Sequence, residues 1–235
     1  GCEAEALQMY HQMVVEGIRP NLVSFVNVLN TCGHLRAIVS GISIHITSIE
    51  LGCDDKQDVI LVTTLVKMYG ECGKLSVAWT IFRQSKNLDI VAWNAMISVF
   101  IQNDELYNAL EAFTIAPKRD SATWNTVIGG LAQNGHGNMA LKLFLQMNLE
   151  GVKPNVVTFV CVLNAFTSTM LLEVGRMVHM LIVDSGLERG IKIENALISM
   201  YGRCGGMSDA KSIFESMQCR NVISWTAIIA AWCET

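Results

Sequence analysis

The chain has 235 residues, of which 51% are hydrophobic, and a formal net charge of −4 at pH 7. No stretch approaches the roughly 18 to 20 uninterrupted apolar residues of a membrane-spanning helix, so no membrane association is expected. The negative charge disfavours strong sequence-independent binding to nucleic acid, which depends on Lys and Arg, but it leaves recognition by a local groove open. The eight cysteines include no Cys-x-x-Cys pair, so no metal site or other cofactor is expected and a reducing compartment fits best.

Short motifs recur along the chain. Residues 17–21, Gly-Ile-Arg-Pro-Asn, return as Gly-Val-Lys-Pro-Asn at 151–155, and residues 69–73, Tyr-Gly-Glu-Cys-Gly, return as Tyr-Gly-Arg-Cys-Gly at 201–205. The other recurring motif is a Trp-Asn pair, at 93–94 and 124–125. Repeats with periods of 20 to 50 residues indicate stacked supersecondary units rather than one globular core.

Alignment of these motifs divides the chain into repeat units. We predict a partial unit at 1–21, complete units at 22–58, 59–89, 90–120, 121–155, 156–190 and 191–221, and a partial unit at 222–235. Because each unit of a repeat protein buries its apolar face only against its neighbours, one elongated array over residues 1–235 is expected. The chain begins and ends inside a repeat, so we also expect it to be a fragment.

Each unit reads as a helical hairpin. In 121–155, apolar residues follow helical spacing from Trp124 to Leu131, Asn134 to Gly137 break the run, and a second apolar stripe follows from Met139 to Met147. The same division recurs in 191–221, which gives about fourteen helices and no strands for the whole chain. Small residues recur at the position of closest helix approach: Ala78, Ala109, Ala140 and Ala210. Two residue types that also recur in register are predicted to pack between helices: Cys72 and Cys204, and His45 and His179.

These units resemble pentatricopeptide repeats, and specifically the plant PLS subclass, in which three repeat types alternate. The resemblance covers essentially the whole chain: 22–58 and 156–190 are similar to the long type, 121–155 to the standard type, and the remaining complete units to the short type. Tetratricopeptide repeats fit poorly, because the Trp-Asn starts and variable unit lengths differ from theirs. The resemblance implies an all-α, right-handed α-solenoid of helix-turn-helix repeats that binds single-stranded RNA, one base per repeat.

In the family, the fifth and last residues of a unit read the base, and the second residues sandwich it. The base-reading residues implied here are Thr63 with Asp89, Asn94 with Asp120, Asn125 with Asn155, Asn195 with Asn221, and Thr226. The first pair would favour G, the second U, and the next two a pyrimidine, which gives the footprint 5′-N-G-U-Y-N-Y-3′. The implied sandwiching residues are Ile60, Val91 and Val157, and the positions that specify no base are Val26, Asp58, Val160 and Gly190.

A purely structural interpretation competes at several of these positions. An Asn near a helix start is usually a cap or a solvated side chain, which could apply to Asn94, Asn125 and Asn195. The apolar second residues could equally be core. Two departures weaken the resemblance: Lys192 replaces an apolar sandwiching residue, and where the family often carries a phosphate-directed Lys this chain has Glu71, Gln102, Gln133 and Arg203. Weak RNA binding is therefore expected.

Three functional classes remain from the sequence. The first is an RNA specificity factor for organellar C-to-U editing, with a cytidine deaminase in the full-length chain or recruited in trans. The His-x-Glu and Pro-Cys-x-x-Cys motifs of such a deaminase are absent from these residues, so no catalysis by this chain and no catalytic residue is expected. The second is a protein-binding scaffold, and the third, a hydrolase, has no clustered carboxylates or placed nucleophile in support. The resemblance implies localisation to the chloroplast or the mitochondrion.

Overall fold

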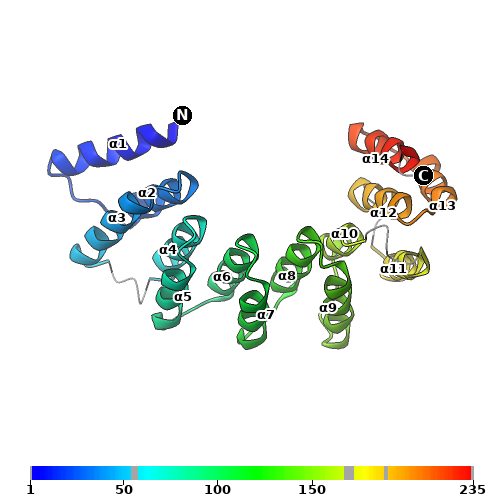
Figure 1. Cartoon of the computed structure of the whole chain (residues 1–235), viewed down its shortest axis with the longest axis horizontal. Coiled ribbons are helices and arrows are strands. Elements are labelled where there is room, and N and C mark those ends of the chain that lie inside the picture. Colours follow the sequence, from blue (N-terminus) through cyan, green and yellow to red (C-terminus); the bar gives the residue numbers. More distant parts are fainter. Residues whose placement is uncertain (1, 54–57, 167–171, 188–189, 234–235) are drawn as a thin grey trace. The chain divides into compact units, whose positions relative to one another are not determined.

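The computed structural model describes residues 2–53, 58–166, 172–187 and 190–233, and these residues are entirely helical apart from their connections (Figure 1). They form α1 (Cys2–Val15), α2 (Leu22–His34), α3 (Ile38–Glu50), α4 (Val59–Glu71), α5 (Leu75–Gln84), α6 (Ile90–Gln102), α7 (Leu106–Ile115), α8 (Ser121–Gln133), α9 (Gly137–Leu149), α10 (Val156–Asn164), α11 (Leu172–Asp184), α12 (Ile191–Arg203), α13 (Met207–Ser216) and α14 (Val222–Cys233). The predicted all-α repeat solenoid is confirmed, and the described residues contain the expected fourteen helices.

The helices fall into two compact units, residues 1–118 and residues 119–235. In the first unit, α2, α4 and α6 pack side by side, and α3, α5 and α7 each pack against the helix that precedes them. In the second unit, α8, α10, α12 and α14 pack in succession, backed by α9, α11 and α13. Each predicted repeat therefore supplies a first helix to one layer and a second helix to the other. No helix in the described part of the chain is long and apolar enough to cross a membrane.

The hairpins are closed by residues in the left-handed backbone region. Gly73 (φ 71°) and Gly205 (φ 75°) follow the first helices α4 and α12, where a residue without a Cβ adopts this conformation at little cost. The amide after Gly73, that of Lys74, donates to the Tyr69 carbonyl at 2.8 Å and so satisfies a helix-terminal acceptor. The repeated Cys-Gly dipeptide of the sequence is thus the turn between the two helices of a hairpin.

The predicted helix contacts are present in the core. The four recurring alanines are buried, at 0–1% exposure: Ala78, Ala109, Ala140 and Ala210. The two recurring histidines join neighbouring repeats, because His45 Nδ1 lies 3.0 Å from the Tyr69 hydroxyl and His179 Nδ1 lies 2.9 Å from the Tyr201 hydroxyl. Burial raises the pKa of Tyr201 to about 12, so this phenol stays protonated at neutral pH.

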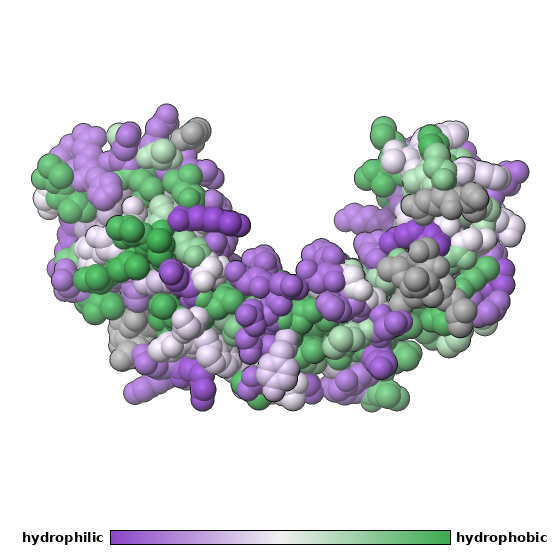
Figure 2. Space-filling model, in the orientation of Figure 1, coloured by the Kyte–Doolittle hydropathy of each residue, from purple (hydrophilic) through white to green (hydrophobic). Residues whose placement is uncertain are grey.

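Helix α3, which is the second helix of the predicted unit 22–58, has an exposed apolar face. Its exposed members are spaced along one side of the helix: Val39, Ile42, Ile46 and Ile49. Figure 2 shows the corresponding hydrophobic patch over α3. The helix α11, which occupies the same place in its own repeat, exposes Met177, Met180, Leu181 and Val183. The second helices of the predicted repeats 22–58 and 156–190 therefore both present apolar surface.

A side chain added at the start of α12 should stabilise the second unit. Gly190 precedes α12 without a side-chain cap, whereas Asn155 accepts a hydrogen bond in the first turn of α10. Gly190→Asp should raise the free energy of unfolding by about 0.5 to 1 kcal/mol, because the carboxylate can accept from first-turn amides and interacts favourably with the helix dipole. Urea denaturation measures this, and an unchanged or lower midpoint would show that the introduced carboxylate does not reach the capping geometry.

Candidate nucleic-acid interface

The predicted base-reading asparagines share one unusual environment. Asn94, Asn125 and Asn195 lie in the first turns of α6, α8 and α12, and each has a side-chain Oδ1 that is buried without a hydrogen-bond partner. Asn195 as a whole is 8% exposed. Buried polar atoms are normally satisfied, so the same exception at the same register in three repeats indicates a common role.

The capping interpretation of these asparagines is wrong. The caps are the last residues of the preceding units, and they hold the first amides of the next helix. Asp89 accepts from the Ala92 amide at 2.8 Å and Asp120 from the Thr123 amide at 2.9 Å. The others behave alike: Asn155 accepts from the Thr158 amide and Asn221 from the Ser224 amide, both at 3.0 Å. Each of these four last residues thus has a fixed side chain, one oxygen of which is used by the helix, whereas Gly190 precedes α12 without a side-chain cap.

The fifth and last residues of one repeat come into direct contact. Asn125 Nδ2 donates to Asn155 Oδ1 at 3.3 Å, although thirty positions separate the two residues in the sequence. Asn155 is the last residue of unit 121–155 and the cap of α10, so the contact joins α8 to the start of the next repeat. Asn125 and Asn155, which are the fifth and last residues of this predicted unit, are therefore in direct contact.

The two threonines at the fifth position have their hydroxyl protons engaged. Thr63 Oγ1 donates to the Val59 carbonyl at 2.7 Å, and Thr226 Oγ1 donates to the Val222 carbonyl at 2.8 Å. Thr63 is half-buried and Thr226 is exposed. A hydroxyl that donates within its own helix has only its lone pairs left for a ligand. The Thr63 and Thr226 hydroxyls consequently offer only acceptors to a ligand.

The apolar second residues are exposed, so the core interpretation of them is wrong. Ile60 is 61% exposed, Val91 58% and Val157 55%. The equivalent residue of the last helix, Ile223, is 64% exposed. They lie about one helical turn before the fifth residues on the first helices, as exposed apolar side chains. Lys192, the polar replacement at this position of α12, is also exposed.

The first helices of the first unit line a cavity of about 580 Å³. It contains Val91 and Asn94 together with polar residues one or more turns further along the helices: Asn30, His34, Lys67, Glu71, Ser98 and Gln102. Ser98 and Gln102 follow Asn94 at four-residue intervals, so they continue one face of α6. Sequence reasoning did not select Lys67, Ser98 or Asn30, although the same four-residue spacing from the fifth residues identifies them.

The positions predicted to specify no base have no free polar group on the first helix. Val26 and Val160 are half-buried, and Gly190 has no side chain. Asp58 caps α4 by accepting from the Ile60 amide at 2.9 Å and from the Leu61 amide at 3.2 Å.

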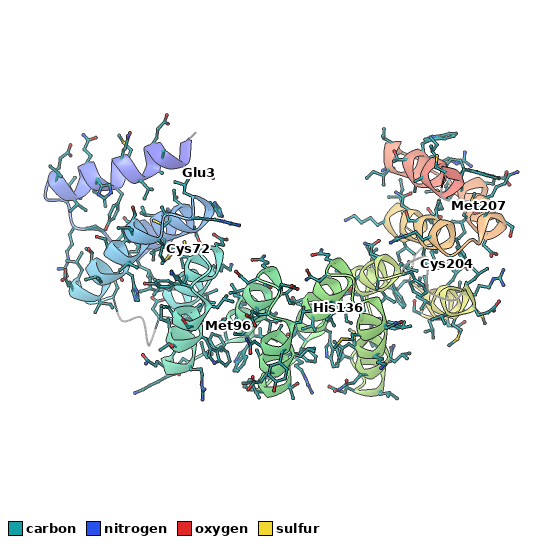
Figure 3. The ribbon with its side chains drawn as sticks, viewed as in Figure 1. Glu3, Cys72, Met96, His136, Cys204 and Met207 are labelled. Atoms are coloured by element: carbon teal, nitrogen blue, oxygen red, sulfur yellow. The ribbon has the colours of Figure 1, made fainter. Side chains whose placement is uncertain are left out.

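Arg203 does not present its guanidinium as a simple phosphate ligand. Nη1 donates to the carbonyls of Phe166 at 3.0 Å and Asn164 at 3.3 Å, while Nε donates to the Ser199 carbonyl at 3.1 Å. Cations near a helix C-terminus interact favourably with its carbonyls, so this side chain ties α12 to the end of α10. The neighbouring Cys204 lies just after α12, as Cys72 does after α4 (Figure 3).

The described residues hold no group of three or more His, Cys, Asp or Glu side chains that could bind a metal ion. Chemically, the recurring groups are hydrogen-bond donors, hydrogen-bond acceptors and apolar surfaces, repeated once per unit along the first helices. Such an arrangement is suited to an extended ligand with repeated flat, polar-edged groups.

The fold and this interface define an α-helical repeat protein with one recurring polar face. A model described as the PPR repeat family matches residues 119–168, and a model described as the PPR repeat matches residues 91–115 and 195–222. The chain belongs to the pentatricopeptide repeat family.

Curated relatives and solved structures agree with this assignment. The Arabidopsis thaliana pentatricopeptide repeat-containing protein At1g11290, chloroplastic, is 32% identical over 100% of this chain and 25% of its own length. The Arabidopsis thaliana protein At4g18520, chloroplastic, is 29% identical over 98% of the chain and 32% of its own length. The chain thus spans about a quarter to a third of these relatives.

Among solved structures, the maize pentatricopeptide repeat protein PPR10 matches with a TM-score of 0.76 at 19% identity, over 97% of this chain and 34% of that one. PPR10 in complex with an 18-nt psaJ RNA element matches with a TM-score of 0.55 at 17% identity, over 94% and 37%. At these identities the likeness concerns the fold.

Proposed function

We propose that this chain binds single-stranded RNA along the layer of first helices, one base per repeat, in the register 5′-N-G-U-Y-N-Y-3′. The observation that carries the proposal is the recurring set of asparagines, Asn94, Asn125 and Asn195, whose side-chain oxygens are buried without a hydrogen-bond partner at the same position of three repeats. Exposed apolar residues beside them supply stacking surfaces. The RNA complex of the similarly folded PPR10 supports the same ligand class.

The chemistry of Thr63 and Asp89 fits guanine. Both groups act as acceptors, since the Thr63 hydroxyl already donates its proton to the Val59 carbonyl and a carboxylate is an acceptor only. The Watson–Crick edge of guanine carries two adjacent donors, at N1 and N2. Uracil carries one donor between two acceptors, so two acceptors on the protein match it less well.

The asparagine positions fit pyrimidines. The Asn94 amide nitrogen donates and Asp120 accepts, which matches an adjacent acceptor and donor on the edge of uracil. In unit 121–155 the Asn155 oxygen is already shared by Asn125 and Thr158, so its remaining polar group is the amide nitrogen. Two donors suit the adjacent O2 and N3 acceptors of cytosine. Asn195 with Asn221 has the same pair of residue types.

The biological role that we propose is that of a specificity factor in RNA processing of chloroplasts or mitochondria. The alternation of unit types resembles the PLS subclass, which favours C-to-U editing as the process. The chemistry would come from a cytidine deaminase, either elsewhere in the full-length protein or recruited in trans, and this chain would select the site. Both Arabidopsis relatives described above are named chloroplastic.

Replacement of Asp89 by asparagine separates base reading from helix capping. Asp89→Asn keeps a side-chain oxygen for the Ala92 amide, so the free energy of unfolding should fall by less than about 1 kcal/mol. The preference for G over A at the second footprint position should fall roughly tenfold, because an amide can donate where the carboxylate only accepts. Fluorescence anisotropy with the two RNAs measures the ratio, and an unchanged ratio would assign Asp89 to capping alone.

A titration of single-stranded against duplex RNA tests the ligand class. The chain should bind the single-stranded footprint at low salt and bind the same sequence in a perfect duplex much more weakly, because pairing hides the edges that the repeats read. Equal affinity for both forms would contradict base reading. The comparison should be made at one stated salt concentration, since phosphate contacts make affinity salt-dependent.

A protein-binding scaffold remains the second candidate function. The observation that favours it is the exposed apolar face of α3 (Val39, Ile42, Ile46 and Ile49) and its counterpart on α11. Contiguous exposed apolar surface is a feature of protein interfaces. In a pure scaffold, substitutions at Thr63 or Asn94 would be without consequence for RNA binding.

A further inference from the structure

Buried hydroxyl groups recur at the third position of the predicted units, three residues after the last residue of the unit before. Three of them belong to side chains with 0% exposure: Thr123, Thr158 and Ser224. Each hydroxyl hydrogen-bonds to the side-chain Oδ1 of the preceding last residue, at 3.0 Å for Asp120, 3.2 Å for Asn155 and 3.1 Å for Asn221. Burial of a hydroxyl is costly unless it is hydrogen-bonded, so these contacts fix the geometry of both partners.

The hydroxyls accompany asparagine rather than aspartate. Every predicted unit that ends in asparagine is followed by a third residue with a hydroxyl: Asn21 by Ser24, Asn155 by Thr158 and Asn221 by Ser224. Aspartate at the same place is followed by a hydroxyl once, at Thr123 after Asp120, whereas Leu61 follows Asp58 and Ala92 follows Asp89. The two residue types differ in one chemical respect. A carboxylate has two equivalent oxygens, but an amide has an acceptor at one end and a donor at the other.

At Asn155 the hydroxyl fixes the orientation of the side-chain amide. Thr158 Oγ1 accepts from the Asn155 backbone N–H at 3.0 Å and donates its own proton to Asn155 Oδ1. The Thr158 backbone N–H donates to the same oxygen at 3.0 Å. A half-turn of the amide would place Nδ2 against these two donors and leave the buried hydroxyl proton without an acceptor, which is unfavourable.

Asn221 and Ser224 repeat this arrangement at the start of α14. The Ser224 hydroxyl accepts from the Asn221 backbone N–H at 3.2 Å, and both the hydroxyl and the backbone N–H of Ser224 donate to Asn221 Oδ1. The orientation of the amide is therefore set in the same way in two repeats.

This orientation decides which polar group the last residue has left for a ligand. α8 packs beside α10 (Figure 1), and Asn125 Nδ2 also donates to Asn155 Oδ1, at 3.3 Å. With three donors on the oxygen, Asn155 Nδ2 is left as a donor, which together with Asn125 suits cytosine. A reversed amide would offer an oxygen instead, and one donor beside one acceptor is the combination that suits uracil at Asn94 and Asp120.

We infer that Thr158 and Ser224 are positioning residues that make Asn155 and Asn221 select cytosine over uracil, because their hydroxyls hold the amide nitrogen in place as a donor. This inference rests on the proposed RNA-binding function. Neither hydroxyl contacts the base, and each acts through the asparagine. The hydroxyl of Thr123 has no such effect, because a half-turn of the Asp120 carboxylate exchanges two equivalent oxygens.

Removal of the Thr158 hydroxyl tests the inference. Thr158→Val keeps the β-branched shape and should lower the ratio of affinities for C over U at the fourth footprint position about fivefold, the scale of one net hydrogen bond. Thr158→Ser keeps a hydroxyl and should retain the original ratio. Fluorescence anisotropy with 5′-N-G-U-C-N-Y-3′ and 5′-N-G-U-U-N-Y-3′ measures it. An unfolded fraction of the chain lowers both affinities equally, so the ratio is independent of stability.

A matched control and a second site accompany this variant. Thr123→Val removes an equally buried hydroxyl that bonds to an aspartate, so it should leave the ratio of U over C at the third footprint position unchanged. Ser224→Ala removes the hydroxyl beside Asn221 and should lower the ratio of C over U at the sixth position. Ser224→Ala therefore tests the inference even if Thr158→Val does not fold.

The outcomes separate the inference from the proposed function. If the unchanged chain prefers the footprint RNA but Thr158→Val and Ser224→Ala keep its C-over-U ratios, the positioning role is overturned and base reading stands. Equal losses of discrimination in Thr158→Val and Thr123→Val also overturn it, because the hydroxyls would then act only on the helix starts. If the unchanged chain does not discriminate between RNA sequences, both are overturned. A loss confined to the two asparagine sites, with recovery in Thr158→Ser, supports the inference.

Discussion

Exchange of Thr63 and Asn94 should invert the base preference of the chain. The variant carrying Thr63→Asn and Asn94→Thr should prefer 5′-N-U-G-Y-N-Y-3′ over 5′-N-G-U-Y-N-Y-3′, whereas the unchanged chain should show the opposite order. The preference inverts because Thr63 acts as an acceptor and Asn94 as a donor. The Thr63 hydroxyl donates its proton to the Val59 carbonyl, and the Asn94 oxygen is buried. Each preference should amount to roughly tenfold or more, on the scale of a matched hydrogen-bonded base contact.

A control for this exchange exists within the same repeat. Thr80 on α5 also donates its hydroxyl to a carbonyl four residues earlier, that of Ser76, at 2.7 Å, but it is exposed on a second helix. Thr80→Asn makes the same chemical change as Thr63→Asn and should leave the order of the two RNAs unaffected. Retention of the original order by the exchanged variant, with normal helicity, would contradict readout through the fifth residues.

The largest effect on stability is expected at the glycine of the repeated motif in α12. A Cβ on Gly202 would lie 2.8 Å from the Ala231 Cα of α14 and closer still to its Cβ. Gly202→Val should lower the free energy of unfolding by about 3 kcal/mol, because the obstacle includes backbone that cannot move without separating the helices. Since repeats interact only with their neighbours, hydrogen exchange should accelerate in α12 and α14 while α4 and α6 keep their protection.

Substitutions of two other glycines provide comparisons for the destabilisation expected from Gly202→Val. At Gly70, the equivalent residue in α4, the three atoms nearest to an added Cβ all belong to the Val99 side chain, with Cγ2 at 2.7 Å. Gly70→Val should therefore be less destabilising, because a side chain can shift. A Cβ added at Gly190 would meet no atom within 4 Å, and Gly190→Ala should change the free energy of unfolding by less than about 0.5 kcal/mol. Equal destabilisation by all three changes would contradict helix contact as the cause, because loss of backbone freedom in the unfolded chain favours folding.

Much of the fold could be predicted because its rules are local and repeated. The four-residue apolar spacing, the Cys-Gly turns and the recurring alanines define each hairpin, and neighbouring hairpins then have only one apolar face to bury. The capping residues could not be assigned in the same way. The sequence allowed Asn94 as a cap, whereas Asp89 caps that helix, because an Asx residue is suited to either place and only the backbone at the helix start decides.

The sequence predicts a register for the candidate site, but it does not predict the electrostatics of that site. The exposure of Ile60 and Val91 depends on the relative orientation of neighbouring first helices. The sequence of a single repeat does not determine this orientation. The engagement of Arg203 by carbonyls of α10 is also a contact between repeats, about forty residues apart. Lys67 and His34 come together in one cavity for the same reason. Features that arise within a hairpin were thus accessible from sequence, and features that arise between hairpins were not.

Site-specific photocrosslinking tests the central claim, that the first helices hold RNA in a one-base-per-repeat register, most directly. With 4-thiouridine at the U of 5′-N-G-U-Y-N-Y-3′, mass spectrometry should locate the crosslink in α6, within residues 90–102, which contain Val91 and Asn94. With 4-thiouridine in place of the G, the crosslink should move to α4, residues 59–71. Crosslinks on the second helices α3, α5 or α7, or a site that does not move with the probe, would contradict the account.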